Sequence, residues 1–215
     1  MEEGPRRKKI RANGHELDLR QFIGHYSLDG EIGTTIVDFY AMAIAIASKG
    51  LETGLRSVSA ATDTTQPAKE LIAAIAEHLT RKISGLKADI LRKAIQETLL
   101  DAAGLGYGPE PLDVKVGLEK FLRKRGAKKI LERLLSSYVF NTVWIRMQDA
   151  VRMKTGSRSL TKSMVGIERA CVSVVKAVVE EWDKNGKLEE LATKKRLGST
   201  LIKTIQTRLI EHPTL

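Results

Sequence analysis

Cysteine, aromatic residues and long uncharged apolar runs are all scarce in this sequence. The single cysteine, Cys171, excludes an intramolecular disulfide and a metal site built from several thiolates. Aromatic residues make up only 5% of the chain, so the core must be built from aliphatic side chains, which suits packed helices. Basic residues rather than an apolar run follow the opening MEEGP, so we expect no secretory signal peptide.

The longest weakly charged segment, residues 32–48, carries Asp38 near its middle. A carboxylate at bilayer depth costs about 2.5–3.5 kcal/mol on insertion scales. A membrane-spanning helix normally needs about 18 apolar residues with few or no charges. We therefore expect a buried core helix here and no membrane span, and a cytoplasmic or intravirion protein that is not secreted.

No catalytic or metal-binding pattern is complete. The four histidines stand far apart, without the spacing of a helical metal site. The phosphate-loop, dinucleotide-binding and hydrolase-elbow motifs (GxxxxGKS/T, GxGxxG and GxSxG) do not occur. The glycines of the segment GLGYG at residues 104–108 lack a following Lys-Ser/Thr. We therefore expect no enzyme, no cofactor and no metal ion.

The chain does have charge gathered in one third of its length. Between Lys115 and Lys176 there are fifteen basic and four acidic residues, so this segment carries the whole net charge of +10. A concentrated cationic segment creates a local positive potential that attracts polyanions, whereas evenly spread charge only aids solubility. This concentration favours a nucleic-acid partner, although a solvated helix face or an acidic protein partner would also explain it.

Three groups of cations are the candidate phosphate contacts. Such contacts hold nucleic acid in place without reading its sequence. The first group lies in the N-terminal arm, the second in a predicted helix with four-residue lysine spacing, and the third around a Gly-Ser loop. Their members are Arg6, Arg7, Lys8, Lys9 and Arg11; Lys120, Arg123, Lys124, Arg125, Lys128, Lys129 and Arg133; and Arg152, Lys154, Arg158 and Lys162.

Apolar spacing predicts an all-α protein, a bundle of about six or seven helices behind a disordered basic arm at residues 1–14. The Gly/Pro-rich segment 104–112 is a candidate hinge between an N-terminal lobe (15–103) and a basic C-terminal lobe (113–215), unless both belong to one domain. Gly198 is a candidate break in the last helix, and residues 51–66 are ambiguous. The helices are expected over residues 31–49, 67–85, 86–103, 113–125, 127–154, 160–184 and 187–211.

Three residues that often carry chemistry are expected in the core instead. Cys171, Trp144 and Trp182 all lie on apolar faces of predicted helices. A buried thiol with no neighbouring histidine is inert. Buried tryptophans cannot stack on bases, which argues against a dedicated single-strand binder.

Taken together, these features favour a non-enzymatic protein that binds or packages nucleic acid through its backbone. A homo-oligomer or larger assembly fits this pattern, such as a nucleocapsid, a viral or mobile-element coat, or a ribonucleoprotein small subunit. One alternative is a helical scaffold that docks an acidic partner. Another is a helix-turn-helix regulator built on residues 188–209, although Arg196 occupies the usual turn glycine position. In that regulator the residues facing DNA would be Ser199, Thr200, Lys203, Thr204 and Arg208.

Overall fold

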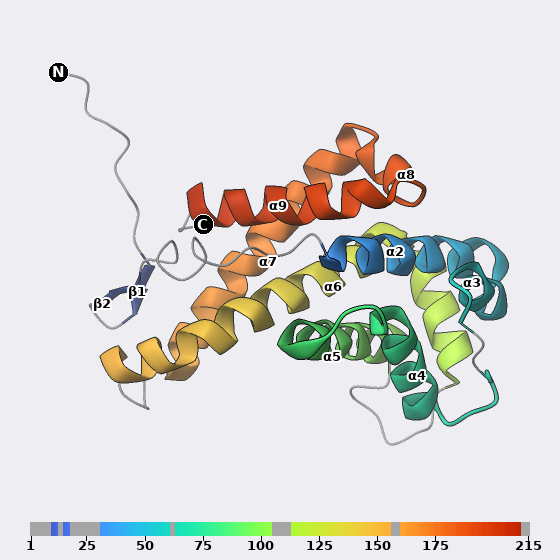
Figure 1. The fold of residues 1–215 in the computed structure, drawn as a ribbon, viewed down its shortest axis with the longest axis horizontal. Coiled ribbons are helices and arrows are strands. Elements are labelled where there is room, and N and C mark those ends of the chain that lie inside the picture. Colours follow the sequence, from blue (N-terminus) through green and yellow to red (C-terminus); the bar gives the residue numbers. More distant parts are fainter. Residues whose placement is uncertain are drawn as a thin grey trace.

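The computed structural model describes residues 10–12, 15–17, 31–60, 63–104, 113–155 and 160–211 (Figure 1). Apart from one short antiparallel hairpin, β1 (Ile10–Ala12) with β2 (His15–Leu17), these residues form helices joined by turns. The predicted all-α bundle is confirmed. The helices are α2 (Glu31–Lys49), α3 (Leu51–Ser57), α4 (Ala68–Thr80), α5 (Gly85–Ala103), α6 (Val114–Thr155), α7 (Leu160–Lys184), α8 (Lys187–Leu191) and α9 (Lys195–Glu211).

Helix α6 crosses the middle of the molecule, and the other long helices pack around it (Figure 1). On one side it contacts α5, which in turn contacts α4. Helix α7 turns back beside the second half of α6, and α2 packs against α6 on a further side. Helix α9 lies over α2 and also contacts α7.

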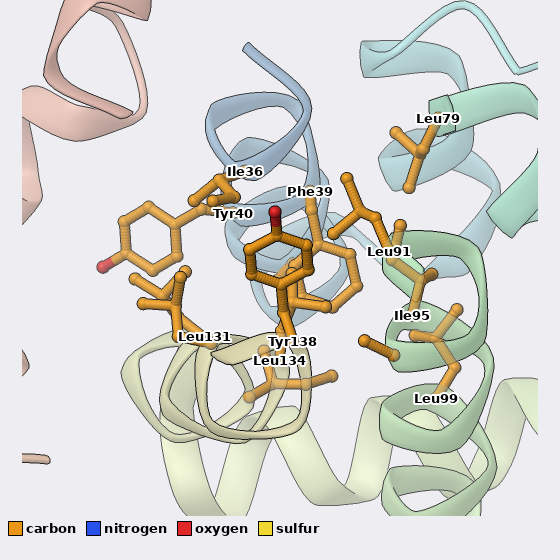
Figure 2. Packing of buried hydrophobic residues seen from close by; sticks show 14 of the residues in the cluster. Ile36, Phe39, Tyr40, Leu79, Leu91, Ile95, Leu99, Leu131, Leu134 and Tyr138 are labelled. Carbon is orange, nitrogen blue, oxygen red and sulfur yellow. The ribbon is translucent and has the colours of Figure 1, made fainter. Parts of the chain in front are cut away.

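The core forms where α2 meets α5 and α6 (Figure 2). Phe39 of α2 points between Leu91 and Ile95 of α5 and Leu134 of α6, and all four side chains are fully buried. Burying each of these side chains stabilises the folded state by about 1.5–3 kcal/mol. The same buried cluster extends from Ile32 to Leu209, so the described parts of the two predicted lobes share one core. Residues 105–112 of the predicted hinge lie outside the described residues.

Helix α2 is long and apolar enough to cross a membrane by length and composition alone. More than half of this stretch is nevertheless buried inside the fold. Ile32 and Ile36, for example, are completely covered by neighbouring helices. This burial agrees with the core helix that the sequence predicted.

Two glycines let the backbones of α2 and α9 touch. A Cβ atom added to Gly198 would clash with the carbonyl oxygen of Gly33, and one added to Gly33 would clash with the backbone nitrogen of Ser199. Only glycine leaves room for such an approach. The predicted break at Gly198 is wrong, because α9 continues through this residue. The interruption lies earlier, at residues 192–194.

Gly126 divides α6 into two segments, as predicted. Its φ of 79° and ψ of 161° lie in a region that is essentially restricted to glycine. The helical segment before it and the longer one after it therefore point in different directions (Figure 1). This bend allows α6 to contact α3 with its first segment and α7 with its second.

One helix ends earlier than predicted, and one helix forms where the sequence was ambiguous. Helix α4 ends at Thr80, before the expected stop at Gly85, and the amide of Ile83 donates to the carbonyl of Thr80 at 2.9 Å to close a turn. Helix α3 lies in the segment that the sequence left ambiguous, and Glu119, 68 residues away, accepts a hydrogen bond from its Leu51 amide at 3.0 Å. This carboxylate satisfies a free amide at the start of α3 in the manner of an N-cap.

The N-terminal arm is partly ordered. Residues 10–12, which we predicted to be disordered, pair with residues 15–17 in the register Ile10 to Leu17. The two residues between the strands are Asn13-Gly14, a sequence typical of a two-residue hairpin. Residues 1–9 and 13–14 of the predicted arm lie outside the described residues.

The contact between α2 and α9 gives a stability prediction. Gly198→Ala should lower the free energy of unfolding by about 1–3 kcal/mol or more, because the added methyl overpacks the crossing. Gly166→Ala in α7 is the control, since its Cβ meets nothing within 4 Å. This control should be neutral or stabilise by about 0.5–1 kcal/mol. Urea unfolding followed by circular dichroism measures both, and equal effects would contradict the close crossing.

Candidate nucleic-acid interface

The three predicted phosphate contacts in the first turns after Gly126, Lys128, Lys129 and Arg133, are already paired with carboxylates. Lys128 of α6 lies 2.6 Å from Asp183 of α7, and this hydrogen bond raises the pKa of the Lys128 ammonium above its usual value. Lys129 lies 2.5 Å from Glu132, whose side chain is buried. A cation paired in this way attracts phosphate less strongly, because the neighbouring carboxylate offsets its field.

Arg133 is held on two sides. Its guanidinium pairs with Asp101 of α5 and lies over the ring of Phe121, 4.8 Å from the centroid. Exposed pairs of this kind contribute only about 0–1 kcal/mol each. Two of these pairs, Lys128 with Asp183 and Arg133 with Asp101, join α6 to α7 and to α5. Lys128, Lys129 and Arg133 are therefore the weakest candidates among the predicted contacts.

The cations before Gly126 are more available. Lys120, Arg123 and Lys124 are exposed on the side of α6 opposite the buried Leu118 and Leu122. Arg123 has a long contact, 3.6 Å, with Glu119, the carboxylate that also accepts from Leu51. Among the described residues no ion pair involves the exposed side chains of the α6-front patch, which we define as Lys120, Lys124 and Arg125.

Two members of the third group, Arg152 and Lys162, lie where α6 and α7 meet, beside the N-terminal hairpin. Strand β2 contacts α6 and strand β1 contacts α7, so the hairpin lies at this end of the molecule (Figure 1). Arg152 of α6 is exposed there, as are Lys162 and Arg169, which lie two turns apart on α7. Within the described ranges these three residues, the hairpin-end patch, have no ion-pair partner.

The structure thus separates the predicted contacts into two areas. Arg152 follows Gly126 by 26 residues of continuous helix, which corresponds to roughly 40 Å. The α6-front patch and the hairpin-end patch therefore lie near opposite ends of α6 (Figure 1). Arg11 lies in β1 and pairs in register with Glu16. The side chains of Arg6, Arg7, Lys8, Lys9, Arg11, Lys154 and Arg158 lie outside what the structure describes.

Sequence reasoning missed a groove of about 710 Å³ between α5, α6 and α7. The rings of Phe140 and Trp144 stack along it, with centroids 6.3 Å apart, and Val172 is exposed at its edge. Trp144 is therefore half-buried in a groove wall and not in the core. The four basic residues that line the groove are matched by four acidic ones, so its charge does not favour a polyanion.

Helix α9 does not present the residues that a helix-turn-helix would need. The preceding helix α8 has only five residues. Ser199 lies against Gly33 in the crossing of α2 and α9. Arg208 pairs with Glu181 of α7 at 3.0 Å. Of the five residues expected to face DNA, only Thr200 and Lys203 are exposed, which argues against a recognition helix here.

No protein-family profile, curated protein or solved structure matches this chain.

Cys171 is completely buried, as predicted. Burial disfavours the thiolate and raises the pKa of Cys171 to about 12. The thiolate is the reactive form, so at neutral pH this side chain is unreactive in the folded protein.

The burial of Cys171 can be tested with Ellman's reagent near pH 8. The native protein should react far more slowly than a free thiol, because both access and ionisation are suppressed. In denaturant the same residue should react completely, which serves as the control. Rapid reaction of the native protein would show that α7 opens readily or is packed differently.

Proposed function

We propose that this protein binds the phosphate backbone of nucleic acid, without catalysis and without reading bases. The observation that carries the proposal is the meeting of the N-terminal hairpin with the end of α6 and α7, where Arg152, Lys162 and Arg169 are exposed and have no ion pair within the described residues. Lysine and arginine side chains in such a setting neutralise phosphates and release counterions.

Further cations neighbour the hairpin and the hairpin-end patch in the sequence. The basic run Arg6–Lys9 directly precedes strand β1 in the sequence. Lys154 and Arg158 lie in the sequence between Arg152 and Lys162. This clustering of cations in the sequence next to the hairpin-end patch supports a surface that contacts several consecutive phosphates.

The α6-front patch provides a second area of contact. At a separation of roughly 40 Å, the two patches match phosphates about 12 base pairs apart along a duplex. One molecule of nucleic acid that reached both patches would be held at two points. This arrangement suits a coat or nucleoprotein subunit that covers its partner in an assembly, and such a role places the protein in the cytoplasm or a virion.

A second candidate function is a protein-interaction module. It is favoured by the groove between α5, α6 and α7, whose apolar part includes Phe140, Trp144 and Val172. An electrophoretic shift assay with random-sequence DNA and RNA at low salt separates the two functions. Absence of any shift would favour the protein partner.

The nucleic-acid proposal predicts a steep dependence on salt. If about 6–10 phosphates are contacted, affinity should fall by about 10³–10⁵ between about 50 and 200 mM salt. Fluorescence anisotropy with a labelled random oligonucleotide measures this slope. An affinity that does not change with salt would refute backbone binding.

The hairpin-end patch can be tested by a triple variant. Arg152→Gln/Lys162→Gln/Arg169→Gln should reduce the slope of log affinity against log salt by about two to three, since each cation contributes about 0.9 on duplex DNA. The control is Lys49→Gln/Lys69→Gln/Lys203→Gln, which removes the same charge from exposed residues elsewhere. Equal slopes for the two variants would show that only net charge matters.

A further inference from the structure

A second concave site lies away from the hairpin end, between α2, the end of α4 and the start of α9. It encloses about 330 Å³, at the lower end of the range for small-molecule pockets. Its walls come from parts of the chain more than 150 residues apart, from Thr34 to Lys195. Neither the charge pattern of the sequence nor the proposed interface accounts for it.

The pocket is lined by three cations and one carboxylate. Arg81 and Lys82 come from the turn after α4, Lys195 from the first residue of α9, and Asp38 from α2. Lys195 and Asp38 are 3.9 Å apart, a long contact that leaves both side chains available to a ligand. Within the described residues Lys82 has no ion pair. The pocket therefore has a surplus of positive charge.

Hydrogen bonds hold the wall that carries Arg81 and Lys82. Thr35 of α2 donates to the carbonyl of Leu79 at 3.0 Å, and this bond is buried. His78 Nε2 lies 3.0 Å from the carbonyl oxygen of Val58, which fixes the ring against the turn after α3. The pocket is thus formed before any ligand binds, which lowers the entropic cost of binding.

The end of α4 would repel an anion if its last carbonyls were free. They are occupied instead. The carbonyl of His78 accepts from the Arg81 amide, that of Leu79 from Thr35, and that of Thr80 from the Ile83 amide. On the opposite wall, the glycine crossing of α2 and α9 holds Lys195 beside Asp38.

We infer that this pocket binds a phosphate monoester. An arginine and two lysines that line one small cavity suit a compact group with two negative charges, and an arginine can donate two parallel hydrogen bonds to two phosphate oxygens. Asp38 would repel the phosphate itself but accepts a hydrogen bond from a hydroxyl of the attached group. A nucleotide, a sugar phosphate or the phosphorylated end of a nucleic acid carries this chemistry.

Isothermal titration calorimetry with adenosine 5′-monophosphate, inorganic phosphate and adenosine tests the inference. We expect the monophosphate to bind with a dissociation constant below about 1 mM and adenosine not to bind. Arg81→Gln/Lys82→Gln should weaken binding by at least about tenfold, because it removes two charge-assisted hydrogen bonds. Lys195→Gln, on the opposite wall, should weaken binding as well. Because this residue lies outside the turn that carries Arg81 and Lys82, a loss of binding in this variant cannot come from local unfolding of that turn.

The matched control is Lys49→Gln/Lys69→Gln, which removes two exposed charges outside the pocket and should leave affinity within about twofold. No binding of the monophosphate at about 10 mM, equal binding of adenosine, or unchanged affinity in both pocket variants would overturn the inference.

Two further measurements identify the source of the phosphate and keep the two proposals apart. If a 5′-phosphorylated oligonucleotide binds more tightly than its 5′-hydroxyl form, and Arg81→Gln/Lys82→Gln removes this gain, the pocket takes a nucleic-acid end. If there is no gain but the monophosphate binds, the pocket takes a free phosphate ester. The hairpin-end triple variant should leave monophosphate binding unchanged, so failure of one proposal does not imply failure of the other.

Discussion

The burial of α2 is the constraint on which the rest of the structure depends. Its apolar side chains point in nearly every direction, with Ile32, Val37, Phe39 and Met42 all buried. A helix with buried apolar residues around most of its circumference needs neighbours on most sides, and in α2 residues such as Asp38 and Ile44 remain partly exposed. Helices α3 and α4 from one half of the chain, and α6 and α9 from the other, supply this cover. The bundle therefore cannot be divided at residues 104–112 without exposing α2.

This packing also decides which cations remain available for ligands. Where α6 lies between α5 and α7, its basic residues face the neighbouring helices. There Arg133 pairs with Asp101 of α5 and Lys128 pairs with Asp183 of α7. Towards the two ends of α6, Lys120 and Arg152 have no such carboxylate beside them among the described residues. The distribution of free charge thus follows from which parts of α6 the neighbouring helices cover.

The sequence was sufficient for most of the helices and for the bend at Gly126, because periodic apolar positions and glycines are local signals. It was insufficient wherever a distant residue decides the outcome. The first amide of α3 is capped by Glu119, and the value of Lys128 as a contact depends on Asp183, 55 residues away. Gly198 was mistaken for a break because close contact with Gly33 cannot be read from either segment alone. The candidate site was therefore predicted as a list of charges and not as a surface.

The hairpin-end patch and the pocket beside Lys195 suit different forms of phosphate. Exposed cations on a convex helical end contact diester phosphates in any register, so they supply affinity without selecting a position along the strand. A small cavity with a fixed wall is too narrow for the interior of a nucleic-acid strand. It suits the phosphate at the end of a strand or a free phosphate ester. Because α2 contributes to the pocket and not to the hairpin end, each site can bind its ligand without the other. Two routes of packed helices connect α2 to the hairpin end: α6, which contacts α2 directly and carries Arg152, and α9 followed by α7.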